Sequence, residues 1–136
     1  MATMEKWILS ANSNYFDHAT AFHTLGYIDW KQTRNYNVGD IVYVYVTKPA
    51  SKIQFKTRVT VVGMTAEEVS DLSKYWIKGE PDKNDKQKYA RLELLKEFDD
   101  NRLSFEELQK HGLLYAPQSP CRVKKELQVF LNSVEE

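Results

Sequence analysis

Residues 38–62 carry the sequence VGDIVYVYVTKPASKIQFKTRVTVV, which decides the fold. Every residue from 41 to 46 is apolar or aromatic, a pattern typical of a strand buried on both faces of a sheet. From residue 53 to 61 apolar and polar residues alternate, which is the period of a half-buried strand. Because only a short turn at residues 49–51 separates the two segments, they are expected to pair as an antiparallel hairpin.

Further strands are predicted on both sides of this hairpin. Residues 7–9 form a short apolar segment after a charged start, and residues 27–30 form a short extended one. Residues 89–98 alternate over most of their length, which favours a strand. A helix with Leu92, Leu95 and Phe98 on one face remains the alternative for that segment.

Helix signals stand between the predicted strands. Asp17 is a candidate N-cap and Gly26 a candidate C-terminal stop for the helix between them. Ser104, followed three residues later by Glu107, forms a capping box that begins a second short helix. A third helix is predicted over residues 123–134, where apolar residues recur at helical spacing.

Two segments of the second half have weaker patterns. Residues 66–72 are expected to form a short helix, and Trp76 follows them. Residues 79–88, GEPDKNDKQK, are polar and charged and are predicted to form a mobile loop.

The chain of 136 residues and 15.9 kDa is long enough for one compact domain with one core. Strands interleaved with short helices predict a single mixed α+β domain over residues 1–136. Its expected architecture is a small curved sheet or pseudo-barrel of about five to six strands with flanking helices.

Charge and composition exclude several classes of protein. Lys plus Arg and Asp plus Glu both number 19, so a highly basic nucleic-acid coat protein is excluded, but a small basic pocket is not. No apolar stretch approaches the roughly 20 residues of a membrane helix, and the first residues lack the pattern of a secretory signal. Cys121 is the sole cysteine, so no internal disulfide can form, and a cytoplasmic location is expected.

Candidate catalytic and metal-binding residues are few. His18 and His23 are five residues apart, the wrong spacing for two ligands on one helical face, and no carboxylate cluster completes a site. A nucleophile pair of Cys121 and His111 would require a loop to fold back on a helix end. The sequence therefore predicts no metal, no cofactor and no catalytic activity. The alternative is a small enzyme acting on a nucleotide or metabolite, with Asp29, His23 or Cys121 as catalytic groups.

A binding function has more support, because amide, basic and aromatic side chains gather after two of the short strands. A base removed from its stack is held by ring faces while amide side chains contact its edge. The candidate base-binding residues from the first half are Asn12, Asn14, Trp30, Lys31 and Gln32. Candidates for contact with phosphates are Lys48, Lys52, Lys56, Arg58 and Arg122. The alternative is that Trp30 belongs to the core and that the basic residues form a solvated strand face.

Four segments together resemble the EVE domain, a PUA-like fold related to the YTH proteins that bind methylated RNA. They are WILSANSNYFD (7–17), YIDWKQTRNYNVGDIVYVYVTKP (27–49), KIQFKTRVT (52–60) and GLLYAPQSPCRV (112–123). The resemblance extends over nearly the whole chain and depends on the order and spacing of these segments.

The resemblance implies roles for individual residues. Trp30 matches a wall of the cage that holds the methylated base, and Asn12 matches the asparagine that contacts the base. Lys31 departs from the pattern at a base-contacting position, so the identity of the base stays open. Trp76 is the candidate for a further cage aromatic, and Gln118, Ser119 and Arg122 are expected at the mouth of the pocket.

These observations lead to one hypothesis and two alternatives. The expected function is non-catalytic capture of a modified, methylated base of DNA or RNA in an aromatic pocket. The alternatives are the small enzyme described above and an adaptor that binds a protein such as a nuclease subunit of a restriction or RNA-modification system. No membrane partner is expected.

Overall fold

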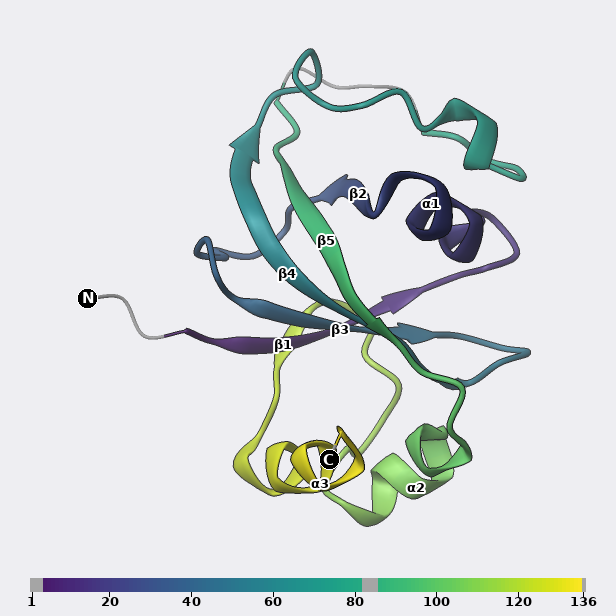
Figure 1. The fold of residues 1–136 in the computed structure, drawn as a ribbon, viewed down its shortest axis with the longest axis vertical. Coiled ribbons are helices and arrows are strands. Elements are labelled where there is room, and N and C mark those ends of the chain that lie inside the picture. Colours follow the sequence, from purple (N-terminus) through teal and green to yellow (C-terminus); the bar gives the residue numbers. More distant parts are fainter. Residues whose placement is uncertain (1–3, 82–85, 136) are drawn as a thin grey trace.

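The computed structural model describes residues 4–81 and 86–135, and within them six strands form one mixed sheet (Figure 1). The order across the sheet is β2-β5-β4-β3-β1-β6. Strands β1 and β3 run parallel, and all other neighbours run antiparallel. The expected α+β architecture is thereby confirmed. The strands are β1 (Lys6–Ala11), β2 (Tyr27–Lys31), β3 (Ile41–Val46), β4 (Lys52–Met64), β5 (Tyr89–Glu97) and β6 (Cys121–Arg122).

The predicted hairpin lies at the centre of the sheet. All six residues of β3 are buried, and β3 pairs with β4 on one side and with β1 on the other. The register places Val44 opposite Phe55, with a bulge directly after Val44. Because both faces of β3 are covered, its sequence does not alternate between apolar and polar residues.

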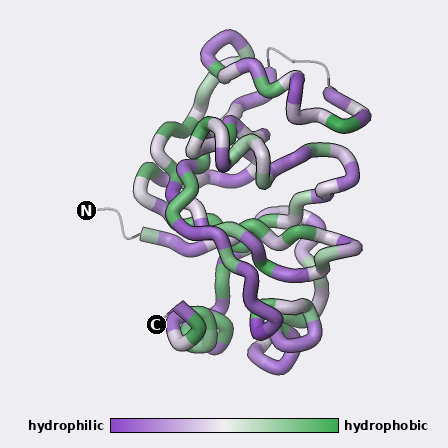
Figure 2. Tube along the Cα trace, turned by 45° about the vertical axis from the view of Figure 1, so that its right-hand side comes forward, coloured by the Kyte–Doolittle hydropathy of each residue, from purple (hydrophilic) through white to green (hydrophobic). Residues whose placement is uncertain are grey.

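Successive residues of the central strands point to opposite faces and so contribute to two separate cores. On one face, Trp7 and Val44 belong to a cluster that includes Phe22 of α1. On the other face, Ile8 and Tyr43 belong to a second cluster. Figure 2 shows hydrophobic residues concentrated on the strands through the middle and on the helix near the C-terminus. The sheet is therefore covered on both sides.

Helix α1 (His18–Leu25) covers the first face and has the predicted ends. The Asp17 carboxylate accepts a hydrogen bond from the Thr20 amide at 3.1 Å, and Gly26 adopts the left-handed conformation that ends the helix (φ +80°). Helices α2 (Phe105–Lys110) and α3 (Lys125–Glu135) cover the other face, as Figure 1 shows. Ser104 begins α2 by accepting a hydrogen bond from the Glu107 amide, which confirms its predicted capping role.

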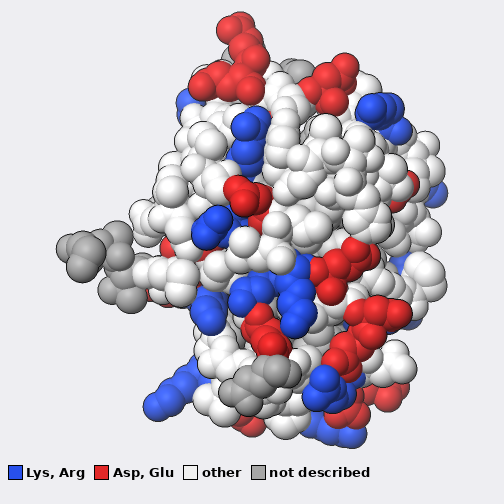
Figure 3. Space-filling model, viewed as in Figure 1, with Lys and Arg blue, Asp and Glu red and all other residues white. Residues whose placement is uncertain are grey.

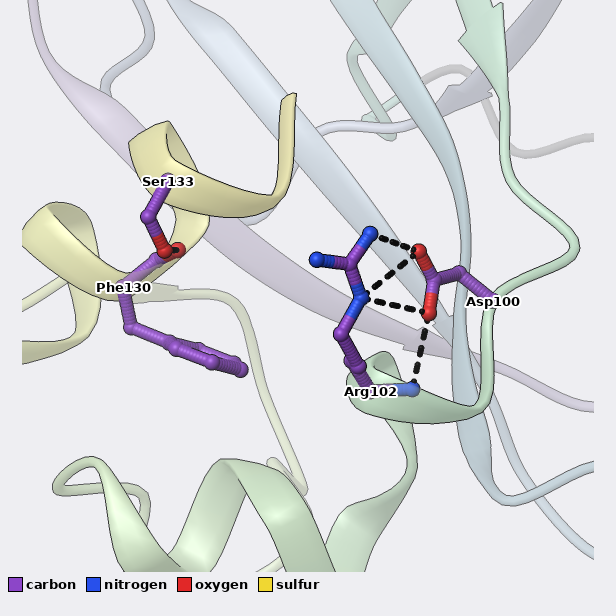
Figure 4. Close-up of polar contacts among 4 residues, drawn as sticks. All are labelled: Asp100, Arg102, Phe130 and Ser133. Atoms are coloured by element: carbon purple, nitrogen blue, oxygen red, sulfur yellow. Dashed lines mark hydrogen bonds and ion pairs between the residues drawn. The ribbon is translucent and has the colours of Figure 1, made fainter. Parts of the chain in front are cut away.

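Local polar contacts stabilise the segment that connects the sheet to α2 and α3 (Figure 4). The Asp100 carboxylate accepts hydrogen bonds from the amide and the guanidinium of Arg102 and so begins the short 3-10 helix η2 (Asn101–Leu103). In α3, the Ser133 hydroxyl donates to the Phe130 carbonyl at 2.6 Å. The Phe130 ring stacks on His111 at the end of α2, which joins the two helices.

The predicted helix at residues 66–72 is wrong. The segment forms turns, and a 3-10 helix η1 (Ser73–Tyr75) follows. The Ser70 amide donates to the Asp29 carboxylate of β2 at 2.8 Å, and the Glu68 carboxylate accepts from the Thr65 amide at 2.9 Å. In this segment, hydrogen bonds from backbone amides to side-chain carboxylates take the place of the backbone hydrogen bonds of a helix. Part of the loop predicted at residues 79–88, namely 82–85, lies outside the described residues.

Within the part of the chain that the structure describes, no helix has the length and apolar composition needed to cross a bilayer.

Candidate functional site

A cavity of about 280 Å³ lies beside β2 and β5, between these strands and the segment that follows β4. Trp30 and Lys31 of β2 and Tyr89 of β5 border it on the sheet side, and Trp76 borders it just after η1. The remaining described residues that line it are Asp29, Val69, Ser70, Asp71, Leu72, Glu80, Pro81 and Gln87. Both tryptophans are half-buried, so the cavity has aromatic walls.

The two indole rings are stacked. Their planes lie within 9° of parallel, with centroids 5.8 Å apart. The Phe16 ring packs at a steep angle to both, with centroid distances of 5.0 Å to Trp30 and 4.9 Å to Trp76. A third ring between the indoles would need a separation of about 7 Å, twice the usual contact distance. The space between the two rings is therefore too narrow for a guest, and both rings border the cavity.

Backbone pairing with the first loop holds Trp76 in place. Phe16 and Trp76 form an isolated antiparallel bridge, and the Ile77 amide donates to the Tyr15 carbonyl at 2.8 Å. The Asp17 amide donates to the Tyr75 carbonyl, also at 2.8 Å. Pairing between segments sixty residues apart in sequence thus brings Trp76 beside Trp30.

An ion pair between Asp29 and Arg91 holds part of the cavity lining in place. The fully buried Asp29 carboxylate accepts hydrogen bonds from Arg91 Nε at 2.7 Å and Nη2 at 3.0 Å, and a third from the Ser70 amide. The hydrogen bond to Asp29 raises the pKa of Arg91, whose guanidinium lies 4.2 Å from the centre of the Tyr27 ring. Three hydrogen bonds from two donor groups thus hold this carboxylate in place at the cavity.

Two carboxylates converge at the cavity. The Ser73 hydroxyl oxygen lies 2.5 Å from Asp71 Oδ1 and 3.1 Å from Glu80 Oε1. Lys31 is the only Lys or Arg among the described residues that line this cavity. The lining is consequently more acidic than basic.

The two histidines of α1 lie in different environments. His18 is buried beside Trp30 and Phe16, where burial lowers its pKa to about 4, and neither ring nitrogen has a hydrogen-bond partner in the described structure. His23 is exposed, with Nε2 2.5 Å from a Glu97 carboxylate oxygen. Among the described residues, no group of three or more His, Cys, Asp or Glu side chains could hold a metal ion.

The predicted amide residues lie outside the cavity lining. Asn12 and Asn14 are exposed in the loop after β1, where Asn12 Oδ1 accepts from the Asn14 amide and Asn14 Nδ2 lies 3.4 Å from the Lys48 carbonyl. The Gln32 side chain is occupied at both ends, since it accepts from the Gly63 amide and donates to the Arg34 carbonyl.

The residues predicted at the pocket mouth surround a different cavity. Gln118, Ser119 and Arg122 line a hollow of about 400 Å³ on the α3 side of the sheet. The strand that carries Arg122, β6, lies at the opposite edge of the sheet from β2. Arg34 connects the two regions, because its guanidinium donates to the Pro120 carbonyl and the Ser119 hydroxyl. Of the predicted site residues, Trp30, Lys31 and Trp76 thus line the cavity beside β2 and β5, and the others lie outside its lining.

Sequence reasoning missed the acidic side of the cavity. Asp71 and Glu80 stand in polar segments whose composition predicts only loops, and no spacing links them to Trp30. The sequence points to Asp29 only as a catalytic group of the enzyme alternative. Its ion pair could not be predicted, because its partner Arg91 lies 62 residues further along the chain. These contacts exist only once β2 and β5 pair.

The other two residues of the enzyme alternative, His23 and Cys121, lie outside the lining of the cavity. Cys121 is exposed on β6, and partial burial of its thiol raises its pKa, which disfavours the thiolate that a nucleophile needs. The exposed His23 has its Nε2 2.5 Å from a carboxylate oxygen of Glu97 at the surface.

Surface charge is mixed on the face that Figure 3 shows. Lysine and arginine side chains lie beside aspartate and glutamate side chains over β3, β4 and β5. Arg58 and Glu93 are 3.6 Å apart, and Lys56 contacts Glu135 at 2.5 Å. Lys52 and Arg122 likewise lie 3.3 Å from Asp99 and 3.9 Å from Glu5. Four of the five basic residues predicted to contact phosphates are therefore paired with carboxylates.

The chain matches no protein-family model and no curated protein. Among solved structures, it is similar to ASCH from Zymomonas mobilis, with 13% identity, a TM-score of 0.59 and coverage of 96% of this chain and 95% of the other. A hypothetical protein from Leishmania major has 16% identity, a TM-score of 0.66 and coverage of 97% and 94%. A Pseudomonas putida protein has 18% identity, a TM-score of 0.65 and coverage of 96% and 99%. The chain therefore shares its fold with these solved structures.

Proposed function

We propose that this protein binds nucleic acid by stacking a single modified base, a methylated one, on the Trp30–Trp76 pair. One observation carries the proposal, namely two parallel indole rings at the border of a cavity of about 280 Å³. Stacking of one base on an aromatic side chain contributes about 1–3 kcal/mol and needs no particular base sequence.

The size and lining of the cavity support a single planar guest. Its volume lies just below the roughly 300 Å³ at which pockets for small organic ligands begin, which suits one base rather than several. A methyl group would add apolar contact with the indole faces at about 0.8 kcal/mol per buried carbon. Hydrogen bonds from Ser70 and Arg91 to Asp29 hold part of the cavity lining in place, which lowers the entropy lost on binding.

The fold gives independent support for nucleic acid as the partner. PUA-like folds of the ASCH type are RNA-binding folds, and the resemblance to EVE domains points to a modified base. The protein is proposed to bind without catalysis, because Asp29 is engaged by three donors and the thiol of Cys121 is disfavoured as a thiolate.

The test is a Trp30→Ala substitution, measured by fluorescence anisotropy with short labelled RNA and DNA oligonucleotides that do or do not carry one methylated base. Loss of one stacking surface is expected to weaken binding of the methylated oligonucleotide at least tenfold. Trp76→Ala should have a similar effect, since its ring borders the same cavity.

Tyr115→Ala is the matched control, because Tyr115 is an exposed aromatic residue that lines the other cavity. It should leave affinity unchanged, and thermal unfolding should show that every variant is folded. Equal affinity of wild type and Trp30→Ala for every oligonucleotide would disprove the proposal. Recovery of a protein partner without nucleic acid would favour the adaptor alternative.

A further inference from the structure

Gln87 contributes the one carboxamide side chain among the described residues that line the cavity beside β2 and β5. We infer that Gln87 determines which base the site accepts, because its Oε1 accepts a hydrogen bond from an N–H group at the edge of the base. The site then prefers a methylated base that keeps such an N–H over one whose edge nitrogens are fully alkylated. This inference rests on the proposed function, because it assumes that the Trp30–Trp76 cavity receives a base.

The orientation of the Gln87 amide is the first step. Its Nε2 donates to the Lys88 carbonyl at 2.7 Å and to the Gln32 carbonyl at 3.4 Å. A carbonyl oxygen can only accept, so only the NH2 end of the amide fits between these two groups. Both protons of Nε2 are thereby engaged. Within the described part of the chain no hydrogen bond reaches Oε1, which is left as an acceptor without a donor.

The second step is the support behind the amide. The Gln32 amide donates to the Lys88 carbonyl at 2.9 Å, so the two carbonyls that hold Gln87 belong to residues joined by backbone pairing. This pair directly follows the one between Lys31 and Tyr89 at the end of the β2–β5 ladder. A side chain held in this way loses little further freedom when a ligand binds.

The third step is the position of the amide relative to the indoles. Lys31 and Tyr89 line the same cavity as Trp30, and Gln87 lines it next to them. A base stacked on an indole has its N–H groups at its edge, so these groups must meet side chains from another part of the lining. A neutral amide oxygen accepts from an N–H and gains nothing from an alkylated nitrogen.

The amides predicted from the sequence do not compete for this role. Asn12 and Asn14 lie outside the cavity lining, and the Gln32 side chain is engaged at both ends. Gln87 therefore takes the position in which an amide was expected, although it stands in a segment whose composition predicts only a loop.

The experiment compares methylated bases that differ in whether an edge N–H remains. Fluorescence anisotropy is titrated with short labelled RNA strands that carry N6-methyladenine, which keeps one amino N–H, or N6,N6-dimethyladenine, which has none. A second pair carries the isomers 5-methyluracil, which keeps its N3–H, and 3-methyluracil, which does not. The wild type is expected to bind the N–H member of the pair that it recognises severalfold more tightly, the usual effect of one neutral hydrogen bond.

Gln87→Met keeps the length of the side chain and removes the acceptor. It should lower affinity for the N–H member to that of the alkylated member, whose own affinity stays the same. Gln87→Ala should have the same effect, and thermal unfolding should show that both variants are folded. Gln109→Met is the matched control, because Gln109 is an exposed glutamine outside the cavity whose Nε2 also donates to a backbone carbonyl, that of Leu114 at 3.2 Å. It should leave the preference unchanged.

The outcomes separate this inference from the proposed function. A preference that survives in Gln87→Met would assign the acceptor to another group of the lining, and an equal loss for both members of a pair would show a structural role alone. Either result, or equal binding of both members by the wild type, overturns the inference and leaves base binding intact. Binding of no methylated strand would overturn both the inference and the proposed function.

Discussion

His18 is a buried imidazole between the Phe16 and Trp30 rings, with centroid distances of 4.7 Å and 5.1 Å. Burial disfavours its charged form and lowers its pKa to about 4, whereas in the unfolded chain it has its ordinary value of 6.5. It therefore stays neutral at neutral pH and packs against Trp30, whose ring borders the cavity. Its position makes the stability of the site depend on pH.

The sign of that dependence follows from proton linkage. Between pH 6.5 and pH 4 the unfolded state binds a proton that the folded state does not, so stability falls as pH falls through this window. A shift of this size corresponds to about 3 kcal/mol when fully developed. Urea unfolding at pH 7 and pH 4.5 should show the loss.

His18→Phe is the informative substitution. It removes the titrating group and two unsatisfied ring nitrogens, so the variant should be at least as stable as the wild type at pH 7 and less sensitive to acid. Carboxylates titrate in both proteins and cancel in the comparison. Identical pH profiles for the two proteins would contradict the role assigned to His18.

Helix α3 is anchored to the sheet by Glu135, close to the end of the chain. Its carboxylate accepts a hydrogen bond from Tyr43 of β3 at 2.8 Å and forms an ion pair with Lys56 of β4 at 2.5 Å. Burial and the hydrogen bond to Glu135 raise the pKa of Tyr43, and the apolar residues Leu127, Leu131 and Val134 cover the second core. The element therefore combines apolar burial with one partly buried polar anchor.

Glu135→Ala should lower the free energy of unfolding by about 2 kcal/mol, the typical contribution of hydrogen bonds to a charged group. Thermal or urea unfolding measures the change. Val129→Ala is the control on the same helix, since Val129 is 63% exposed and its loss should change stability by less than about 0.5 kcal/mol. Equal effects of the two substitutions would show that Glu135 does not anchor the helix.

At the scale of the whole molecule, balanced and interspersed charge distinguishes this protein from nucleic-acid binders that rely on phosphate contacts. The formal net charge is zero, and basic side chains on the face of Figure 3 lie beside acidic ones. Few counterions would be released on binding of a nucleic acid, so under the proposed function most of the affinity is expected to come from the stacked base.

This balance predicts a weak dependence of binding on salt. With one or two phosphate contacts, affinity for a methylated single strand should fall by less than about tenfold between 50 and 200 mM salt. Anisotropy titrations over this range measure the slope. A fall of about a thousandfold would indicate a phosphate-binding groove and assign the affinity to a surface other than the aromatic cavity.

The sequence predicted the centre of the fold because the signals there are local. The unbroken apolar run of β3, the alternation of β4 and the caps Asp17, Gly26 and Ser104 all act within a few residues. The helix predicted at residues 66–72 is wrong because the Ser70 amide donates a hydrogen bond to Asp29, a residue distant in sequence. Local propensity does not contain that information.

For the candidate site, the sequence by itself determined the kinds of side chain, indole at positions 30 and 76 and amides and cations elsewhere. Only the tertiary structure decided which of them meet. Pairing of β2 with β5 and of Phe16 with Trp76 brings the indoles together with Asp71 and Glu80, while β6 holds Arg122 at the far edge of the sheet. The physical reason is that strand order across a sheet depends on long-range pairing, which the residues near each position do not specify.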